Sequence, residues 1–352
     1  ALRLGCEAFA SDLNPVACLI LKAMLEDIPR HGPTLAEELR RVGKEIQEYL
    51  EKELAAFYPT DPDGSKPIAY LWARTVRCES PNCGAEIPLI RSFWLCKKAN
   101  RKRALKYKNI HPAGTRRALP STEFEIFEPK NDHEVPLGTV SRAKATCLCC
   151  GTVLPPDRVR AQLAAQRGGA DVIFDEKGAH ISGARMLAVV ILRHGESNRY
   201  YRLPTERDYQ AIWKSQKRLQ DILEEWEGEG RKGLCPIPDE PMNTQSSTTV
   251  AGRGYGFTTW GQLFTARQKL TLSTLAKRAS NFGVNSFELS VPHEIAGLGV
   301  SRFSDICNAF CRWESTKTQV RNLFARQAIP MLWDFAEPDI FGDNAGNYQV
   351  TI

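Results

Sequence analysis

Residues 78–84 read Cys-Glu-Ser-Pro-Asn-Cys-Gly, and residues 147–151 read Cys-Leu-Cys-Cys-Gly. A four-thiolate zinc site needs its sulfurs about 2.3 Å from the ion, and short turns that end in glycine let backbone amides approach those sulfurs. The two stretches therefore predict a zinc site made by Cys78, Cys83, Cys147 and Cys150. The alternative is four reduced, buried cysteines without a metal. Zinc would hold together a segment whose sequence is too polar for a strong core.

The other cysteines are weaker candidates. Cys149 could replace Cys147 or Cys150, but the Cys-x-x-Cys-Gly register favours the outer two. Cys96 is a further, less favoured ligand. The remaining cysteines are most simply core or incidental thiols: Cys6, Cys18, Cys235, Cys307 and Cys311.

The bulk properties indicate a protein of two or three domains. The chain has 352 residues and eleven cysteines, an odd number that leaves one thiol unpaired in any full disulfide scheme. No stretch approaches the roughly 18 apolar residues that span a bilayer, and no signal peptide is visible at the start. We therefore expect a cytoplasmic protein that has no membrane partner.

The net charge of +6 is unevenly distributed along the chain. Residues 91–108 contain eight basic residues and no acidic one, with Phe93, Trp94 and Tyr107 between them. Such a run suits phosphate contacts combined with base stacking, and so predicts a nucleic-acid partner. The alternative is a solvated surface. The candidates for nucleic-acid contact are Arg91, Lys97, Lys98, Arg101, Lys102 and Arg103.

The amino-terminal residues predict a piece of a parallel α/β sheet. Residues 6–11 suggest a short buried strand that ends at Asp12. Asn14 followed by Pro15 predicts a helix over residues 15–27. An acidic residue at the end of such a strand can bind the ribose of an adenosine cofactor, although many such aspartates only cap a helix.

Other patterns place elements along the rest of the chain. Thr34 and Glu37 predict a capping box, and apolar residues at helical spacing from Leu35 to Phe57 predict one buried stripe. Short strands are expected at 69–76, 87–95, 124–127, 139–145, 186–192 and 199–203. Helices are expected at 157–166, 205–226 and 265–279, and residues 303–335 are expected to be mainly helical.

These elements suggest four regions. Residues 1–65 form a partial α/β segment with a helical extension, and residues 66–156 a zinc-ribbon insertion. Residues 157–240 form an α/β region with a long helix, and residues 241–352 a mainly helical region. The fold class is therefore α/β, a partial Rossmann-like fold with an inserted β-rich zinc ribbon and additional helical regions.

Two features near residue 260 leave alternatives open. Gly252-Arg-Gly-Tyr-Gly256 could cradle a phosphate, but no clear strand precedes it, which favours a flexible loop. Arg267, near the start of a helix that a Thr265–Gln268 capping box would begin, could contact a phosphate or form an intramolecular salt bridge.

Several phrases resemble those of the bacterial and archaeal adenine-specific DNA methylases that contain a zinc ribbon. They are Ser-Asp-Leu-Asn-Pro-Val-Ala at 11–17, Cys-Gly-Ala-Glu-Ile-Pro-Leu at 83–89, Tyr-Gly-Phe at 255–257, Leu-Phe-Thr-Ala-Arg-Gln at 263–268 and Phe-Ala-Arg-Gln-Ala-Ile-Pro-Met-Leu-Trp-Asp-Phe at 324–335. The resemblance extends over nearly the whole chain. It implies a class I fold that transfers a methyl group from S-adenosylmethionine to the exocyclic amine of adenine in DNA. It also gives Asp12 the ribose-binding role, with Leu13 and Asn14 as cofactor contacts.

The resemblance also implies that two parts of the reaction centre lie outside these residues. The family's glycine-rich cofactor loop would precede residue 1, and its catalytic Asp-Pro-Pro-Tyr motif would follow residue 352. The only Pro-Pro pair, Pro155-Pro156, lacks the aromatic residue that would stack on a flipped base. We therefore expect no catalytic residue in this chain and no activity from it alone. Other subunits of a restriction or defence system are candidate partners.

The second hypothesis is a non-catalytic zinc-ribbon module that acts as an adaptor in a nucleic-acid complex. It explains the cysteines and the basic run equally well, but not the phrase at residues 11–17. A hydrolase or protease is disfavoured, because the histidines form no metal-ligand pair at helical spacing and no serine lies in a Gly-x-Ser-x-Gly elbow.

Overall fold

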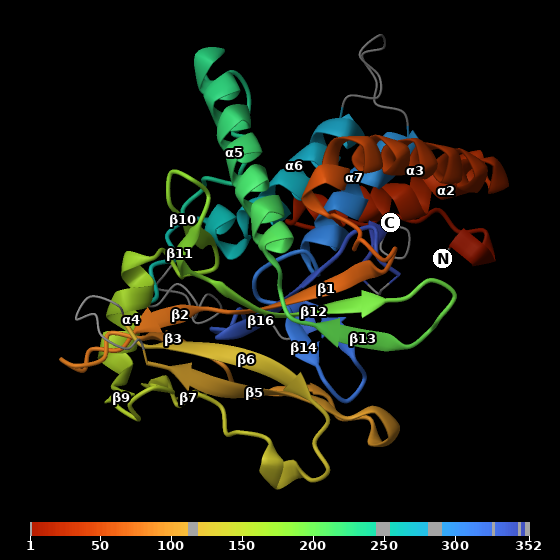
Figure 1. Ribbon diagram of the computed structural model, residues 1–352. Helices are drawn as coiled ribbons and strands as arrows, with labels where there is room; N and C mark the ends of the chain where they lie inside the picture. The colour runs from red at the N-terminus through yellow and green to blue at the C-terminus, as the bar shows by residue number, and fades with distance from the viewer. Residues whose placement is uncertain are drawn as a thin grey trace.

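The computed structural model describes residues 2–111, 119–243, 254–280, 291–325, 328–343 and 346–348. Helices and antiparallel sheets occupy different parts of the molecule (Figure 1). Helices α3, α6 and α7 gather on one side of a central sheet, and strands β5, β6 and β14 lie on the other side. The fold is therefore a mixed α and β one.

The helical elements begin with a long amino-terminal series and recur between the strands. Their bounds are η1 Leu2–Leu4, α1 Pro15–Lys22, η2 Ala23–Asp27, α2 Ile28–His31, α3 Pro33–Leu54, η3 Ala55–Phe57, η4 Ala99–Arg101, η5 Asp132–Glu134, α4 Pro156–Ala165, α5 Glu206–Gly228, η7 Trp260–Leu263, α6 Ala266–Ser280, α7 Val291–Ser304 and η8 Leu323–Ala325.

The strands form one four-stranded sheet and several small ones, and every strand pair in the described ranges is antiparallel. Their bounds are β1 Lys66–Ala73, β2 Thr75–Arg77, β3 Glu86–Pro88, β4 Trp94–Cys96, β5 Arg103–Ile110, β6 Ser121–Phe127, β7 Val140–Ser141, β8 Lys144–Thr146, β9 Val153–Leu154, β10 Val172–Phe174, β11 His180–Gly183, β12 Arg185–Leu192, β13 Arg199–Arg202, β14 Arg312–Glu314, β15 Gln319–Arg321 and β16 Asp334–Pro338.

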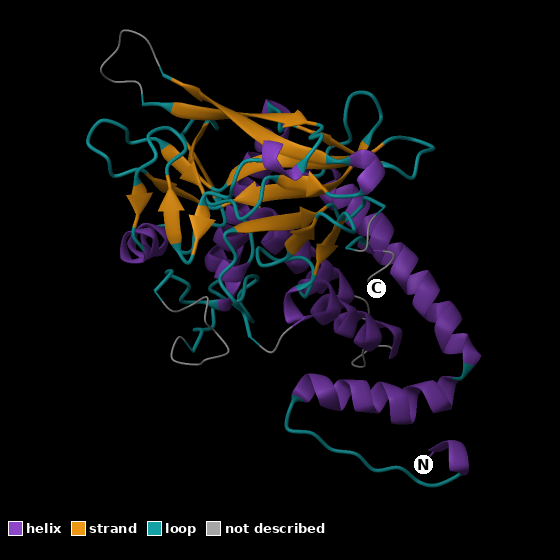
Figure 2. Ribbon diagram, turned by 90° about the horizontal axis from the view of Figure 1, so that it is seen from below, coloured by secondary structure: helices purple, strands orange, loops and turns teal. Residues whose placement is uncertain are grey.

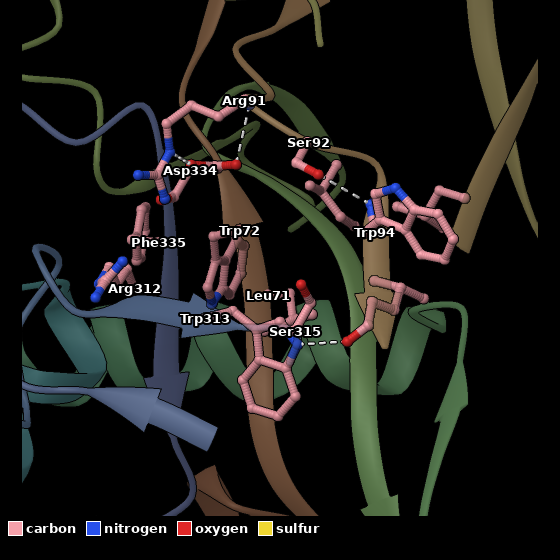
Figure 3. A pocket seen from close by; sticks show the side chains of 13 residues that line it. Leu71, Trp72, Arg91, Ser92, Trp94, Arg312, Trp313, Ser315, Asp334 and Phe335 are labelled. Atoms are coloured by element: carbon pink, nitrogen blue, oxygen red, sulfur yellow. Dashed lines mark hydrogen bonds and ion pairs between the residues drawn. The ribbon is translucent and has the colours of Figure 1, made fainter. Parts of the chain in front are cut away.

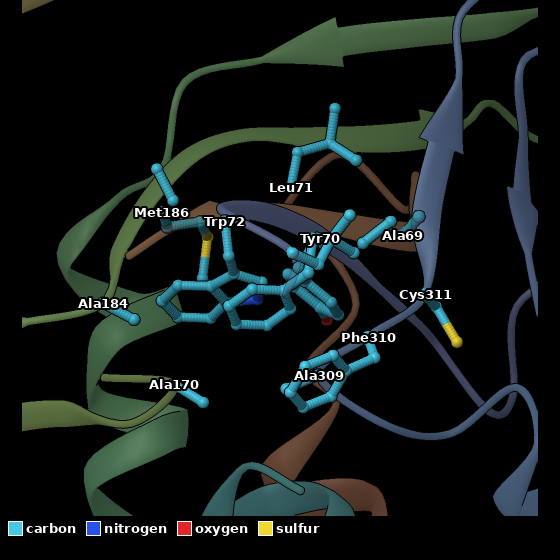
Figure 4. Packing of buried hydrophobic residues seen from close by; sticks show 14 of the residues in the cluster. Ala69, Tyr70, Leu71, Trp72, Ala170, Ala184, Met186, Ala309, Phe310 and Cys311 are labelled. Carbon is cyan, nitrogen blue, oxygen red and sulfur yellow. The ribbon is translucent and has the colours of Figure 1, made fainter. Parts of the chain in front are cut away.

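The central sheet has the order β13-β12-β1-β16 and carries the core. Strand β1 pairs with a strand on each side and is covered on both faces, so it is an almost uninterrupted apolar run. Trp72 of β1 stacks on Phe335 of β16, with ring centroids 6.2 Å apart. Figure 4 shows Trp72 within this core, with Met186 and Phe310 among the labelled side chains of the same cluster. The sheet takes strands from three of the four regions expected from the sequence, whose boundaries stay a prediction.

Helix α3 buries the apolar stripe that the sequence predicted. Leu35, Val42, Ile46, Leu50 and Leu54 are buried at helical spacing, and the helix packs against α6 and α7. The predicted capping box at its start is wrong. Proline occupies the first helical position after Gly32, and the Thr34 hydroxyl donates to the carbonyl of His31 instead.

The expected opening strand is also wrong. Residues 6–12 pair with no described strand and are mostly exposed, so water can satisfy most of their backbone groups. Figure 2 shows this segment and α1 at the margin of the molecule, away from the sheets. The predicted helix cap does form, since the Asn14 side chain accepts from the amide of Val16 at 2.9 Å. The described residues thus contain no parallel sheet, and the Rossmann-like expectation has no support in them.

Residues 303–335 differ from expectation too. The segment contains the β14–β15 hairpin and the start of β16, rather than being mainly helical. Strand β16 is required to cover the second edge of β1, and this tertiary pairing overrides the local helical pattern. The predicted helix at 265–279 is confirmed as α6, and both arms of its Thr265–Gln268 capping box are present.

Candidate metal centre and the basic residues

Two short hairpins present the predicted cysteines. The turn between β2 and β3 carries Cys78 and Cys83, and the turn between β8 and β9 carries Cys147 and Cys150. Each turn is closed by backbone hydrogen bonds, including Cys78 N to Ala85 O at 2.8 Å and Cys147 N to Thr152 O at 2.9 Å. Gly84 and Gly151 have φ of +65° and +75°, which explains why glycine follows the second cysteine of each pair.

The four sulfurs form one compact group. Cys78 Sγ lies 3.5 Å from Cys150 Sγ, and Cys83 Sγ lies 3.7 Å from Cys147 Sγ. All four lie within 4.8 Å of one another. A tetrahedron with metal–sulfur bonds of about 2.3 Å has edges of about 3.8 Å, close to these spacings. The cluster could hold a metal ion, and the four thiols that the sequence predicted are the ones brought together.

Cys149 does not belong to this group. Its sulfur lies 3.4 Å from Thr122 Oγ1 and 3.7 Å from Asn109 Oδ1, both on the β5–β6 hairpin. The register that favoured the outer cysteines is therefore confirmed. Among the described residues, no other group of three or more His, Cys, Asp or Glu side chains is arranged to hold a metal. Cys96, Cys307 and Cys311 are buried, Cys235 is half-buried, and Cys6 and Cys18 are exposed.

The thiols differ in their ease of ionisation. Burial raises the pKa of Cys78 and of Cys83. Cys150 is exposed, and a hydrogen bond from Thr152 lowers its pKa to about 6. Metal ligands are thiolates, so an incoming cation would find Cys150 deprotonated first and would displace protons from the buried thiols.

Helix α4 holds the first hairpin in place. It begins directly after β9, so it links the two cysteine turns. Arg158 donates to both carboxylate oxygens of Glu79, which follows Cys78. The Gln162 side chain accepts from the amide of Arg77 and donates to its carbonyl. These contacts fix the backbone on which Cys78 is carried.

The predicted cofactor residues lie far from any sheet. Asp12, Leu13 and Asn14 are exposed, and the Asp12 carboxylate accepts from the amide of Asn14 at 2.8 Å. In the described residues, Asp12 thus has a local capping role beside the start of α1. A role in ribose binding stays a prediction.

The basic run forms β4, η4 and β5, and part of its charge is paired within the protein. Arg91 pairs with Asp334, and Arg103 pairs with Glu128 at 2.7 Å. Lys102 lies 3.3 Å from Asp132. Sequence reasoning missed these acidic partners because they come from later segments. Residues 123–128 do contain three glutamates, which is a signal that could have been used.

Three of the predicted cations have no such partner. Within the described ranges, Lys97, Lys98 and Arg101 form no ion pair, and Lys97 and Arg101 are exposed. The ammonium groups of Lys97 and Lys102 lie 5.1 and 5.9 Å from the centroid of the Trp94 ring. The available positive charge is therefore concentrated around β4 and η4.

An aromatic pocket of about 240 Å³ opens beside this charge (Figure 3). Trp72, Trp94, Trp313 and Phe335 line it, and the Arg91–Asp334 pair lies at its upper end in the figure. Trp313 Nε1 donates to the carbonyl of Leu95 at 2.7 Å, which fixes the indole ring. The pocket combines stretches far apart in the sequence, so no local pattern could have indicated it.

The two open features near residue 260 now have structural explanations. Arg267 is buried and makes two hydrogen bonds of 2.9 Å to the Glu337 carboxylate. Of the two alternatives, the intramolecular salt bridge is therefore the one that forms. Gly252 lies outside the described residues. At Gly256, φ is +87° and an added Cβ would lie 2.5 Å from the carbonyl oxygen of Ala164, so this glycine allows close packing on α4.

In comparisons with protein-family models, curated proteins and solved structures, the chain matched none. Within the described residues, every helix is too short or too polar to cross a membrane.

Proposed function

We propose that this chain is the zinc-braced, DNA-positioning part of an S-adenosylmethionine-dependent DNA adenine methyltransferase. The observations that carry the proposal are a four-thiol cluster of tetrahedral spacing and, elsewhere on the β5–β6 sheet, cations that form no ion pair with any described residue. The methyl-transfer assignment rests on the resemblance of the phrases at residues 11–17, 83–89, 255–257, 263–268 and 324–335.

Zinc suits the cluster better than a harder cation, because four sulfur ligands without carboxylates favour soft or borderline metals. Zinc bound there would supply a cross-link between the two hairpins. All four positions are taken by protein ligands, so no site would remain for water or substrate. The centre therefore has a structural role in this proposal, and Cys78, Cys83, Cys147 and Cys150 are its ligands.

The DNA-binding part of the proposal rests on Lys97, Lys98 and Arg101. A methylase must extrude its target base from the duplex, and the distorted strand must then be held by phosphate contacts. The aromatic pocket lies next to these cations and offers Trp94 and Trp313 as stacking surfaces. Arg91, Lys102 and Arg103 would contribute less, because acidic neighbours already offset their charge.

Catalysis is assigned to motifs that these 352 residues do not contain, namely the glycine-rich loop and Asp-Pro-Pro-Tyr. In this proposal Asp12 binds the cofactor ribose when those motifs complete the site, and the exposed position of residues 12–14 leaves them accessible. The alternative is the non-catalytic adaptor. The antiparallel pairing of all described strands favours it, because a methyltransferase core needs a parallel sheet.

The test measures binding of a fluorescein-labelled, adenine-containing duplex by anisotropy over a range of salt concentrations. A Lys97→Gln, Lys98→Gln, Arg101→Gln triple variant should bind the duplex about tenfold more weakly. The slope of log affinity against log salt concentration should fall by the equivalent of up to about three phosphate contacts. The control removes the same charges from exposed positions of α3, as Arg40→Gln, Lys44→Gln and Lys52→Gln. Equal affinities for both variants would contradict the DNA-positioning role.

A calorimetric titration with S-adenosylmethionine separates the two candidates. The methyltransferase proposal expects weak or no binding to this chain and measurable binding to the product of the complete coding sequence. A complete product that binds DNA, lacks both motifs and binds no S-adenosylmethionine would leave the adaptor as the function.

A further inference from the structure

A second, smaller cavity lies next to the basic run. It has a volume of about 80 Å³ and lies among the segment after β4, the turn between β12 and β13, and the start of β15. Its lining includes Lys98, Arg101, Ser197, Arg199, Tyr201 and Thr318. A space of this size is large enough for one small oxyanion.

The charge around this cavity is positive and uncompensated. Three of its lining residues are cations, and no carboxylate lines it. In the described part of the chain, Lys98, Arg101 and Arg199 make no ion pair. Three like charges that share one cavity repel each other, and a bound anion would relieve that repulsion.

The polar groups are arranged to receive a ligand. Arg199 Nε is buried without a hydrogen-bonding partner, and the Tyr201 hydroxyl has only the weakly polar Cys96 thiol beside it. Buried donors of this kind normally have a partner, so their state indicates a missing acceptor. Arg101 donates to Asn198 Oδ1, which orients its guanidinium group at the cavity.

We propose that this cavity binds one phosphate group of a nucleic-acid strand, with Lys98, Arg101 and Arg199 as the binding residues. Arginine suits the role because its guanidinium fork matches phosphate oxygens. That the phosphate belongs to a nucleic acid rests on the proposed function, and one contact supports it. The Tyr201 ring meets the Trp313 ring edge-on with centroids 6.4 Å apart, so the phosphate cavity adjoins the aromatic pocket.

The first measurement is the melting temperature in inorganic phosphate and in chloride at equal ionic strength. Phosphate should raise the melting temperature of the unaltered chain and of Lys108→Gln, an exposed charge-matched control on β5. It should leave Arg199→Gln and the surface variant Arg101→Gln unchanged. Melting in chloride reports whether each variant is folded, and Arg101→Gln keeps the test valid if Arg199→Gln does not fold. A phosphate effect equal in all four proteins would overturn the site.

The second measurement is anisotropy with a labelled single-stranded oligonucleotide. Arg199→Gln and Arg101→Gln should each weaken binding about threefold, and millimolar phosphate should compete for the unaltered chain. Binding that is unaffected by either substitution would overturn the inference, and the duplex measurement with the triple variant would then decide the proposed function separately. If the chain binds phosphate but no oligonucleotide, the phosphate in this cavity does not come from a nucleic acid, and the proposed DNA-positioning role is overturned as well.

Discussion

The four sulfurs of the cluster occupy different environments, and this determines what each substitution does. Cys78, Cys83 and Cys147 are buried, whereas Cys150 is exposed. Cys149 is the natural control, because it neighbours the cluster in sequence but contacts β5 and β6 instead.

We predict that Cys83→Ser and Cys150→Ser lose bound metal and destabilise the two hairpins, since a structural zinc site contributes its binding energy to folding. Cys149→Ser should keep close to one equivalent of metal. Metal analysis of the purified proteins measures this. Full metal occupancy in Cys83→Ser would reject the ligand set.

Asp339 makes folding depend on pH. Burial raises its pKa from 3.8 to about 6, while the amide groups of Phe341 and Gly342 donate to its carboxylate. Between those pH values the folded chain binds more protons at this residue than the unfolded chain does. The stabilising contribution is therefore complete below about pH 4 and is lost as the pH rises through 6.

The loss amounts to roughly 3 kcal/mol at most, from two pKa units at about 1.4 kcal/mol each. We predict that Asp339→Asn removes this part of the pH dependence. Urea unfolding at pH 4, 5, 6 and 7 gives the two stability profiles. Profiles that stay parallel across this range would show that Asp339 titrates normally in the folded chain.

At the scale of elements, buried charge joins α6 to the central sheet. Arg267 of α6 pairs with Glu337 of β16, and both side chains are almost fully buried. Trp72 Nε1 of β1 donates to the same carboxylate at 3.0 Å. Removal of one partner of such a pair leaves an uncompensated charge in the core.

We predict that Glu337→Ala lowers the free energy of unfolding by about 3–5 kcal/mol. The control is Glu125→Ala, whose exposed pair with Lys106 spans 3.0 Å and should contribute less than about 1 kcal/mol. Urea denaturation measures both. A loss at Glu337 no larger than that at Glu125 would contradict the core role of the pair.

Elements with their own periodicity could be predicted from the sequence, and elements that depend on a partner could not. The stripe of α3 and the Thr265–Gln268 cap are local patterns, and both are present. Residues 6–12 have a strand-like composition but find no partner, so they stay unpaired. Strand β16 exists because β1 needs an edge partner, a requirement that its own residues do not reveal.

At the scale of the whole molecule, the candidate sites join distant segments. Cys78 and Cys150 are 72 positions apart, and their turn chemistry alone was enough to predict the cluster. The aromatic pocket and the phosphate cavity had no such signal, because Trp94, Arg199 and Trp313 carry no spacing that refers to one another. Likewise, the basic run predicted charge but not its acidic partners across the β5–β6 hairpin.

The metal centre is the feature on which the account most depends, because it would fix β2–β3 against β8–β9 in the part of the molecule that carries the β5–β6 sheet. X-ray absorption at the zinc edge tests it directly on the purified protein. We predict one zinc per chain with four sulfur neighbours at about 2.3 Å. A protein without zinc, or a zinc shell containing nitrogen or oxygen, would contradict the four-cysteine centre.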